Sequence, residues 1–313
     1  MRKPVEIAVV SAKGGEGRTL LASSLGKIAE SGVMADCDVG APNMHLILDP
    51  HTVTEGVFLG DKYAVLNMSL CNQCGECFKA CRFDAIKEGD VPEGWLYSVD
   101  TLACEGCGVC TRVCPQGALE LTSSPAGAWY VSTSTLGPFV HASLTPGQRN
   151  PDGLVRIVRR EARRVAAREE KGLIIADAPA GVGAQVTAAI AGTDLALLVA
   201  EPVVSGTSGL RKVIDLMRKH GVAVVCVINK HDVDPGRTSD IEDYLARSGI
   251  PVVGKIPFSE KVNEVVGNLG FPVDLAGDPA AREIRRMGER VCTLVKRFEQ
   301  EQSSEAGEES RGR

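Results

Sequence analysis

Short apolar runs of strand length recur along most of the 313-residue chain. They occupy residues 5–10, 33–38, 173–177, 195–200, 222–228 and 252–257. The run at 173–177 is continuous rather than alternating up to its final carboxylate, which is typical of a strand buried on both faces of a parallel sheet. Helices are expected between them at residues 20–32, 153–171, 207–219 and 284–298. This alternation predicts an α/β fold with a mostly parallel, doubly wound sheet and helices on both of its faces.

A second domain is also expected, because the chain exceeds the size at which a single core usually keeps growing. Residues 67–124 interrupt the alternation and are entered and left through short polar segments. We therefore divide the chain into a first sheet-forming segment at 1–66, an insert at 67–124 and a second sheet-forming segment at 125–300. Residues 301–313 are polar, which predicts a disordered tail.

Charge and hydropathy exclude two kinds of partner. The net charge of −5 argues against nucleic acid as the main partner. The uncharged stretch at 121–148 is rich in Ser, Thr, Gly and Pro, so no stable membrane insertion is expected. No signal peptide is visible, because Met1-Arg2-Lys3 precede only a short apolar run. We expect the protein to be cytoplasmic.

Eight of the eleven cysteines form two runs with the spacing C-x2-C-x2-C-x3-C, from Cys71 to Cys81 and from Cys104 to Cys114. This spacing is typical of [4Fe–4S] ligation, because it lets three successive thiolates converge on a compact cubane. A zinc ribbon would instead carry two C-x2-C pairs separated by a dozen or more residues. Disulfides would need an oxidising compartment. The runs therefore predict two [4Fe–4S] clusters.

In paired runs of this kind the fourth cysteine ligates the other cluster. One predicted ligand set is therefore Cys71, Cys74, Cys77 and Cys114, and the other is Cys104, Cys107, Cys110 and Cys81. The segment closely resembles a small α+β bacterial two-cluster ferredoxin, since residues 83–86 repeat at 116–119. Arg82 departs from that pattern, which usually has a proline after the fourth cysteine, as at Pro115.

A second motif follows the first predicted strand directly. Gly14, Gly15 and Gly17 lie between this strand and a predicted helix, which is the context of a phosphate-binding loop. In such a loop, backbone N–H groups wrap the phosphates and the helix N-terminus adds a favourable dipole. Thr19 would ligate Mg²⁺. An ordinary glycine-rich turn is the alternative.

The sequence KGGEGRT at residues 13–19 resembles the phosphate loop of the MinD/ParA-type P-loop ATPases, a family that includes Mrp-like scaffolds. The resemblance implies that Lys13 reaches across a dimer interface to the nucleotide of a second subunit. The family's second lysine is replaced here by Arg18, which keeps the charge but is planar and longer. Glu16 would tend to repel phosphate. We therefore expect nucleotide binding with slow or no ATP hydrolysis.

Two acidic motifs extend the resemblance. D-x-D-x-x-x-P-N at residues 36–43 implies that Asp38 orients the attacking water or a Mg²⁺-bound water, and that Asn43 belongs to the adjoining switch. D-x-P-x-G at residues 177–181 implies that Asp177 supports Mg²⁺ and senses the γ-phosphate. The alternative is that these carboxylates merely end their strands.

The base-binding residues follow from the same resemblance. Asn229 is implied to contact the base, and the loop at Pro257 to lie near it. The segment N-K-x-D that ends at Asp232 also occurs in the guanine-reading motif of GTPases. ATP is favoured, and GTP remains the alternative.

The leading hypothesis is a nucleotide-binding iron–sulfur protein. MgATP would close a homodimer, or a heterodimer with a related subunit, and reposition the ferredoxin lobe toward a redox or metallocofactor protein partner. One alternative is an electron-carrier ferredoxin on a weakly active or inactive nucleotide-binding scaffold. A MinD-like positioning ATPase, which would use the arginines flanking its last helix, is another.

Overall fold

The computed structural model describes residues 3–89, 96–203 and 207–311. The chain forms two compact units. The larger unit consists of Met1–Gly56, Ala128–Pro146 and Pro151–Arg313, and the smaller unit of Val57–Gly127 and Gly147–Asn150. The smaller unit contains the whole predicted insert.

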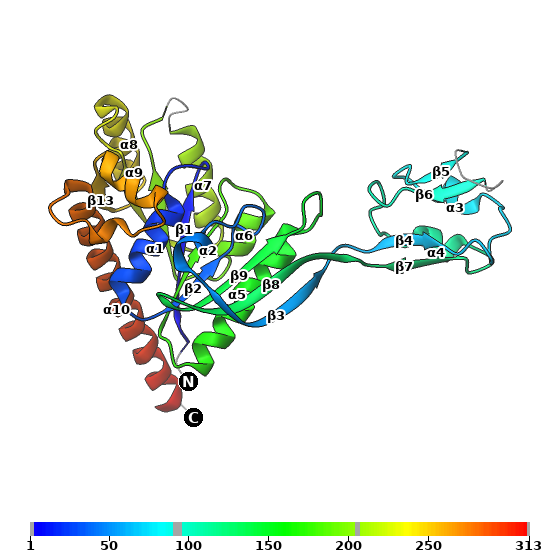
Figure 1. Ribbon diagram of the computed structural model, residues 1–313, viewed down its shortest axis with the longest axis horizontal. Coiled ribbons are helices and arrows are strands. Elements are labelled where there is room, and N and C mark those ends of the chain that lie inside the picture. Colours follow the sequence, from blue (N-terminus) through cyan, green and yellow to red (C-terminus); the bar gives the residue numbers. More distant parts are fainter. Residues whose placement is uncertain (1–2, 90–95, 204–206, 312–313) are drawn as a thin grey trace. The chain divides into compact units, whose positions relative to one another are not determined.

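A nine-stranded sheet with the order β13-β12-β11-β1-β10-β2-β9-β8-β3 organises the fold (Figure 1). Its strands are β1 (Val5–Ser11), β2 (Val33–Asp36), β3 (His51–Leu59), β8 (Pro125–Ser134), β9 (Gly137–Leu144), β10 (Leu173–Asp177), β11 (Leu195–Ala200), β12 (Ala223–Asn229) and β13 (Val252–Ile256). From β13 to β9 each neighbouring pair is parallel. The predicted α/β class with a mostly parallel sheet is confirmed.

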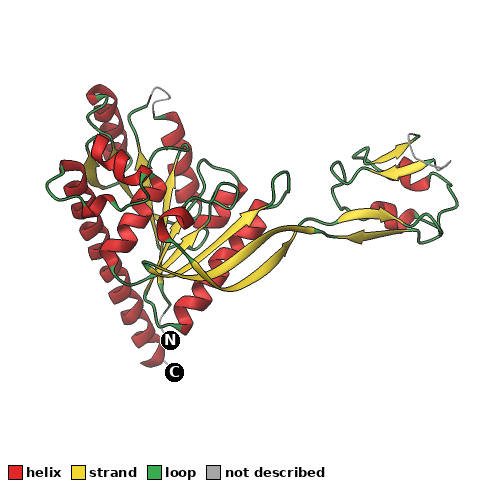
Figure 2. Ribbon diagram, in the orientation of Figure 1, coloured by secondary structure: helices red, strands yellow, loops and turns green. Residues whose placement is uncertain are grey.

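Helices lie on both faces of this sheet (Figure 2). They are α1 (Arg18–Ala29), α2 (Met44–Leu48), α5 (Pro151–Arg168), α6 (Ala184–Ile190), α7 (Ser208–Lys219), α8 (Pro235–Arg247), α9 (Glu260–Gly267), the 3₁₀ turn η2 (Pro272–Asp274) and α10 (Pro279–Arg311). Ile7 and Val9 of β1 pack with Leu25 of α1 and Met287 of α10 in one buried core. Because side chains alternate along a strand, Glu6 points to the opposite face, toward α5.

A buried ion-pair network joins β1 to α5. Glu6 is 1% exposed, and its two carboxylate oxygens lie 2.6 Å from Arg159 Nε and 2.6 Å from Arg163 Nη2. Arg159 Nη1 also donates to the carbonyls of Ala188 and Ala191, at the end of α6. A buried carboxylate is tolerated only when it is paired and hydrogen-bonded in this way. The arginine-rich helix is therefore tied to the central strand.

The described residues of the smaller unit form two short antiparallel strand pairs and two short helices. β4 (Tyr63–Leu66) pairs with β7 (Leu119–Thr122), and β5 (Ile86–Glu88) pairs with β6 (Tyr97–Val99). α3 (Glu76–Ala80) and α4 (Val109–Val113) each contain the third cysteine of their run, Cys77 and Cys110. This is the predicted α+β insert.

Helix α10 extends to Arg311, within the region 301–313 where a disordered tail is expected, and residues 312–313 lie outside the described part of the chain. Glu, Gln and Ala favour helix, and adding residues to an existing helix costs little compared with starting a new one. Within the described part of the chain, none of the helices has the length and apolar character needed to cross a bilayer.

Candidate functional site

The phosphate loop lies between β1 and α1 and requires glycine at one position. Gly17 has φ +94°, and a Cβ there would lie 2.7 Å from Asn229 Nδ2. The Asn229 amide donates to the Glu16 carbonyl at 3.0 Å and is 8% exposed. A buried side chain from the end of β12 thus holds the loop, which leads directly into the N-terminus of α1.

Arg18 lies at the start of α1 and is 8% exposed. Its Nη2 lies 3.3 Å from Asp38 Oδ2, and its Nη1 donates to the Ala178 carbonyl. One guanidinium therefore connects the phosphate loop to the residues that follow β2 and β10. A lysine ammonium could not make this forked contact in the same way.

Thr19 and Asp177, both predicted to take part in Mg²⁺ binding, lie in contact with each other. The Thr19 hydroxyl donates to Asp177 Oδ2 at 2.5 Å, while the buried Asp177 Oδ1 has no hydrogen-bond partner among the described residues. Burial raises the pKa of Asp177 to about 6, against the opposing effects of Thr19 and Arg18. A buried carboxylate oxygen without a donor beside a threonine hydroxyl fits a hard cation or its bound water.

Asp36 and Asp38 have different roles. Asp36 is fully buried, and it accepts the backbone N–H groups of Asp38 at 3.0 Å and Met44 at 3.2 Å. Burial, with Asp177 nearby, raises the pKa of Asp36 well above its ordinary value. Asp36 shapes the turn after β2, and Asp38 is the carboxylate that faces Arg18.

The Glu16 carboxylate is buried within the loop rather than exposed at its surface. Its side chain turns behind the loop, is 5% exposed, and accepts the Lys13 backbone N–H at 3.3 Å. Burial raises the pKa of its carboxyl. The backbone φ angles of the loop decide which way the Glu16 side chain points, so its direction cannot be predicted from the sequence motif.

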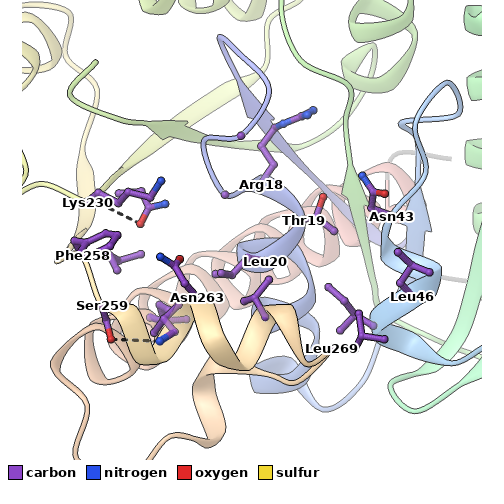
Figure 3. Close-up of a pocket in the computed structure, with 18 of the residues that line it drawn as sticks. Arg18, Thr19, Leu20, Asn43, Leu46, Lys230, Phe258, Ser259, Asn263 and Leu269 are labelled. Atoms are coloured by element: carbon purple, nitrogen blue, oxygen red, sulfur yellow. Dashed lines mark hydrogen bonds between the residues drawn. The ribbon is translucent and has the colours of Figure 1, made fainter. Parts of the chain in front are cut away.

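A hollow of about 420 Å³ opens beside the loop (Figure 3). Figure 3 shows Lys230 and Phe258 at one side of it and Asn43 and Leu46 at the other. The predicted site residues that line this hollow are Gly15, Gly17, Arg18, Thr19, Asp38, Asn43, Asn229 and Pro257. Sequence reasoning missed Phe258, Ser259, Asn263 and Leu269, which also line it. Phe258 could have been found, because it follows Pro257 directly.

Asp232 lies outside the residues that line this hollow. Its Oδ1 accepts the Phe258 N–H at 2.7 Å, so the carboxylate positions the Pro257–Phe258 loop. The structure therefore does not support a direct contact between Asp232 and a base. Lys13 and Gly14 are exposed and are not among the residues that line the hollow.

Members of both predicted ligand sets lie near one another in the smaller unit. A small hollow in the smaller unit is lined by Cys81, Cys104, Cys107 and Cys110. In the other set, burial raises the pKa of the Cys77 thiol, and the nearby thiols of Cys114 and Cys71 add to the effect. Cys74 is exposed. Both groupings bring together cysteines of the two runs, and four thiols are the donors that a cubane takes.

Backbone N–H groups point at several of these thiols. Ala64 donates to Cys104 Sγ at 3.4 Å, Gln73 to Cys71 Sγ at 3.4 Å and Ala118 to Cys114 Sγ at 3.2 Å. Such N–H···S contacts tune cluster potentials. The Arg82 guanidinium lies 4.7 Å from the centre of the Phe83 ring, and Phe83 borders the hollow of the second set.

Comparison with known proteins gives the family. The model described as "4Fe-4S dicluster domain" matches residues 70–119. Protein MJ0578 of Methanocaldococcus jannaschii is 31% identical over 230 residues, which are 72% of this chain and 78% of that protein. The chain belongs to the MinD/ParA-type P-loop proteins that carry an inserted [4Fe–4S] ferredoxin domain.

Two further similarities cover most of this chain. ATP-binding protein MJ0547 of M. jannaschii is 24% identical over 293 residues, covering 92% of this chain and 87% of that protein. The solved structure of the septum site-determining protein MinD with Mg-ADP from Pyrococcus horikoshii has a TM-score of 0.56 at 16% identity. It covers 93% of this chain and 97% of that one. At that identity the likeness shows the fold.

Proposed function

We propose that this protein is a MgATP-dependent switch that controls a two-cluster ferredoxin lobe for electron transfer or metallocofactor assembly. The observation that carries the proposal concerns two carboxylates that flank the insert in the sequence. Asp38 follows β2 and Asp177 ends the neighbouring strand β10, and both are tied to the phosphate loop through Arg18 and Thr19. A nucleotide in the loop would therefore act on the chain on both sides of the insert.

Several residues would hold the nucleotide. The backbone N–H groups of Gly14, Gly15 and Gly17 would bind its phosphates at the start of α1. Thr19 and Asp177 would hold Mg²⁺, which neutralises charge on the phosphate oxygens. The side of the hollow lined by Asn229 and Phe258 would take the base. ATP is preferred to GTP, because Asp232 is engaged by the Phe258 backbone.

Arg18 supplies the switching element of this proposal. A γ-phosphate would compete with Asp38 for the guanidinium, because both are anionic oxygen acceptors. Transfer of Arg18 to phosphate would release Asp38 and the residues that follow it. Arg18 would exchange between the phosphate and Asp38. For the fraction of time that it stays on Asp38, that carboxylate is less available to orient an attacking water, so hydrolysis would be slow.

The proposal includes a second subunit and a protein partner. Lys13 is exposed beside the loop and could reach the nucleotide of a partner subunit, either a second copy or a related chain. The cluster lobe would then face a redox or metallocofactor protein. Free thiols that ligate clusters suit a reducing compartment such as the cytoplasm.

Binding and turnover of MgATP and MgGTP by anaerobically purified protein test the proposal. We expect MgATP to bind more tightly than MgGTP, with turnover slow relative to dissociation, and Thr19→Ala to lose the Mg²⁺ requirement. Binding of neither nucleotide would contradict the switch. It would favour the second candidate, an electron-carrier ferredoxin on an inert scaffold. The ion pair between Arg18 and Asp38 supports this candidate, because it occupies the guanidinium that would bind a phosphate.

A further inference from the structure

The segment at residues 145–150 connects two sets of contacts that bear on the proposed switch. It follows β9 and precedes α5. The chain enters the smaller unit between Pro146 and Gly147 and leaves it again between Asn150 and Pro151. Each end of the segment is held by hydrogen bonds within its own unit.

One end is bonded to the turn that carries Asp38. β9 pairs with β2, and the Leu144 N–H donates to the Val39 carbonyl at 2.9 Å. Val39 is 2% exposed and directly follows Asp38, whose carboxylate Arg18 holds. Because this carbonyl belongs to a buried, close-packed turn, a displacement of Asp38 would be transmitted to Leu144.

The other end is bonded to the loop of one cysteine triplet. Arg149 Nη1 lies 2.5 Å from Glu105 Oε1, and Arg149 Nη2 donates to the Leu102 carbonyl at 2.7 Å. Glu105 lies between Cys104 and Cys107 and lines the hollow that the second ligand set surrounds. The Arg149 guanidinium therefore holds the chain on both sides of Cys104, the first cysteine of the second run.

The loop held by Arg149 has little freedom to adjust. Gly106 has φ +59°, and a Cβ there would lie 2.1 Å from the Lys62 carbonyl oxygen. The residue before Lys62 is bonded to the same segment, because Asn150 Nδ2 donates to Asp61 Oδ1 at 2.9 Å. Arg149 and Asn150 thus bind two stretches of chain, and Gly106 of one stretch lies against Lys62 of the other. A movement of the segment would change the surroundings of the cluster ligands.

We propose that Arg149 is a positioning residue that couples the nucleotide switch to the cluster ligated by Cys81, Cys104, Cys107 and Cys110. This inference rests on the proposed function and names the route of coupling. The Arg149 and Glu105 side chains are 52% and 48% exposed, so their ion pair is weak enough to be made or broken by a small displacement. A guanidinium held near the cysteine ligands stabilises the reduced cluster, because that form carries more negative charge. Moving the guanidinium away therefore lowers the reduction potential of the cluster.

Redox titration of the anaerobic full-length protein, with the two clusters separated by their EPR signals, tests this route. In the wild type we expect MgATP to change the reduction equilibrium of one cluster about tenfold, within the usual range of coupling between sites. That factor corresponds to about 59 mV for a one-electron couple. Arg149→Ala should bind MgATP with wild-type affinity and lose this shift. Glu105→Gln, which removes the same ion pair from the other side, should lose most of it.

Arg112→Ala is the matched control, because it removes one exposed arginine from the same unit without touching the segment. It should keep the nucleotide-dependent shift. A wild-type shift that persists unchanged in both Arg149→Ala and Glu105→Gln would overturn the role of Arg149 and leave the proposed function standing. A wild type that binds MgATP but shifts neither cluster would overturn the gating proposal and this route with it.

Discussion

Arg18 and Asp38, twenty residues apart in the sequence, form an ion pair at 3.3 Å that joins the phosphate loop to the turn after β2. The same guanidinium donates to Ala178, which follows Asp177. Arginine thus serves here as a link among three segments that a nucleotide would contact. A lysine at this position could bind phosphate but could not hold all three segments together.

Arg18→Lys is predicted to raise the rate of ATP hydrolysis. The shorter ammonium would leave Asp38 free to orient a water, and losing one charge-assisted hydrogen bond of about 1.5 kcal/mol corresponds to about a tenfold rate increase. Single-turnover kinetics with MgATP would measure it. Arg168→Lys, in an exposed pair with Glu169, serves as the control and should be unchanged. Equal rates for Arg18→Lys and the wild type would show that the pair does not limit turnover.

Gly17→Ala should weaken MgATP binding by at least about tenfold and lower the free energy of unfolding by about 1–3 kcal/mol. The added Cβ would be forced against the Asn229 amide at a positive φ that only glycine adopts readily. Urea unfolding and nucleotide titration measure the two effects. Gly267→Ala, at the end of α9 with nothing within 4 Å of its Cβ, should leave both unchanged or slightly raise stability. Wild-type binding by Gly17→Ala would mean that the loop tolerates a side chain.

His141 should make the protein less stable in mild acid. It lies on β9 with its ring stacked 4.6 Å from Phe139, and burial, with a contribution from His45, lowers its pKa from 6.5 to about 4. Below pH 6.5 the unfolded chain takes up a proton that folded His141 does not. The free energy of unfolding therefore falls as the pH drops from about 6.5 to 4, by about 2 kcal/mol after allowance for partial exposure.

His141→Gln carries no titrating group, so its stability should depend less on pH across that window by the same amount. Urea unfolding of both proteins at several pH values gives the difference, in which the contributions of other groups cancel. Parallel curves for the two proteins between pH 4 and 6.5 would count against a depressed pKa.

The crossed ligand sets predict how single cysteine variants lose iron. Cys81→Ala should disrupt the cluster of the second triplet, and Cys114→Ala that of the first, with about half of the iron lost in each case. Iron analysis and EPR of the reduced proteins distinguish the two. Cys292→Ala, on α10, should retain all of it. Loss of the first-triplet signal in Cys81→Ala would show that each run ligates its own cluster.

Features that local geometry dictates could be predicted from the sequence. The phosphate loop is one, because Gly17 must lie between a strand and a helix for the backbone to approach a phosphate. The cysteine runs are another, since two-residue gaps suit convergence on a cubane. The continuous apolar run of β10 likewise indicated a buried parallel strand.

Features that depend on tertiary contacts could not be predicted. The direction of Glu16 depends on loop φ angles, and the role of Asp232 depends on where the Phe258 N–H lies. The hydrogen bonds of Arg149 join residues more than forty positions apart, and no local pattern marks them. β3 extends the sheet with exposed Thr and Glu side chains, a composition that did not indicate a strand.

The most direct test of the central claim is the affinity of MgATP for the protein with its clusters oxidised and with them reduced, measured anaerobically by equilibrium dialysis. If nucleotide binding changes a cluster potential, thermodynamic linkage requires reduction to change nucleotide affinity by the same factor. The account predicts affinities that differ about tenfold between the two redox states. Equal affinities in both states would contradict it.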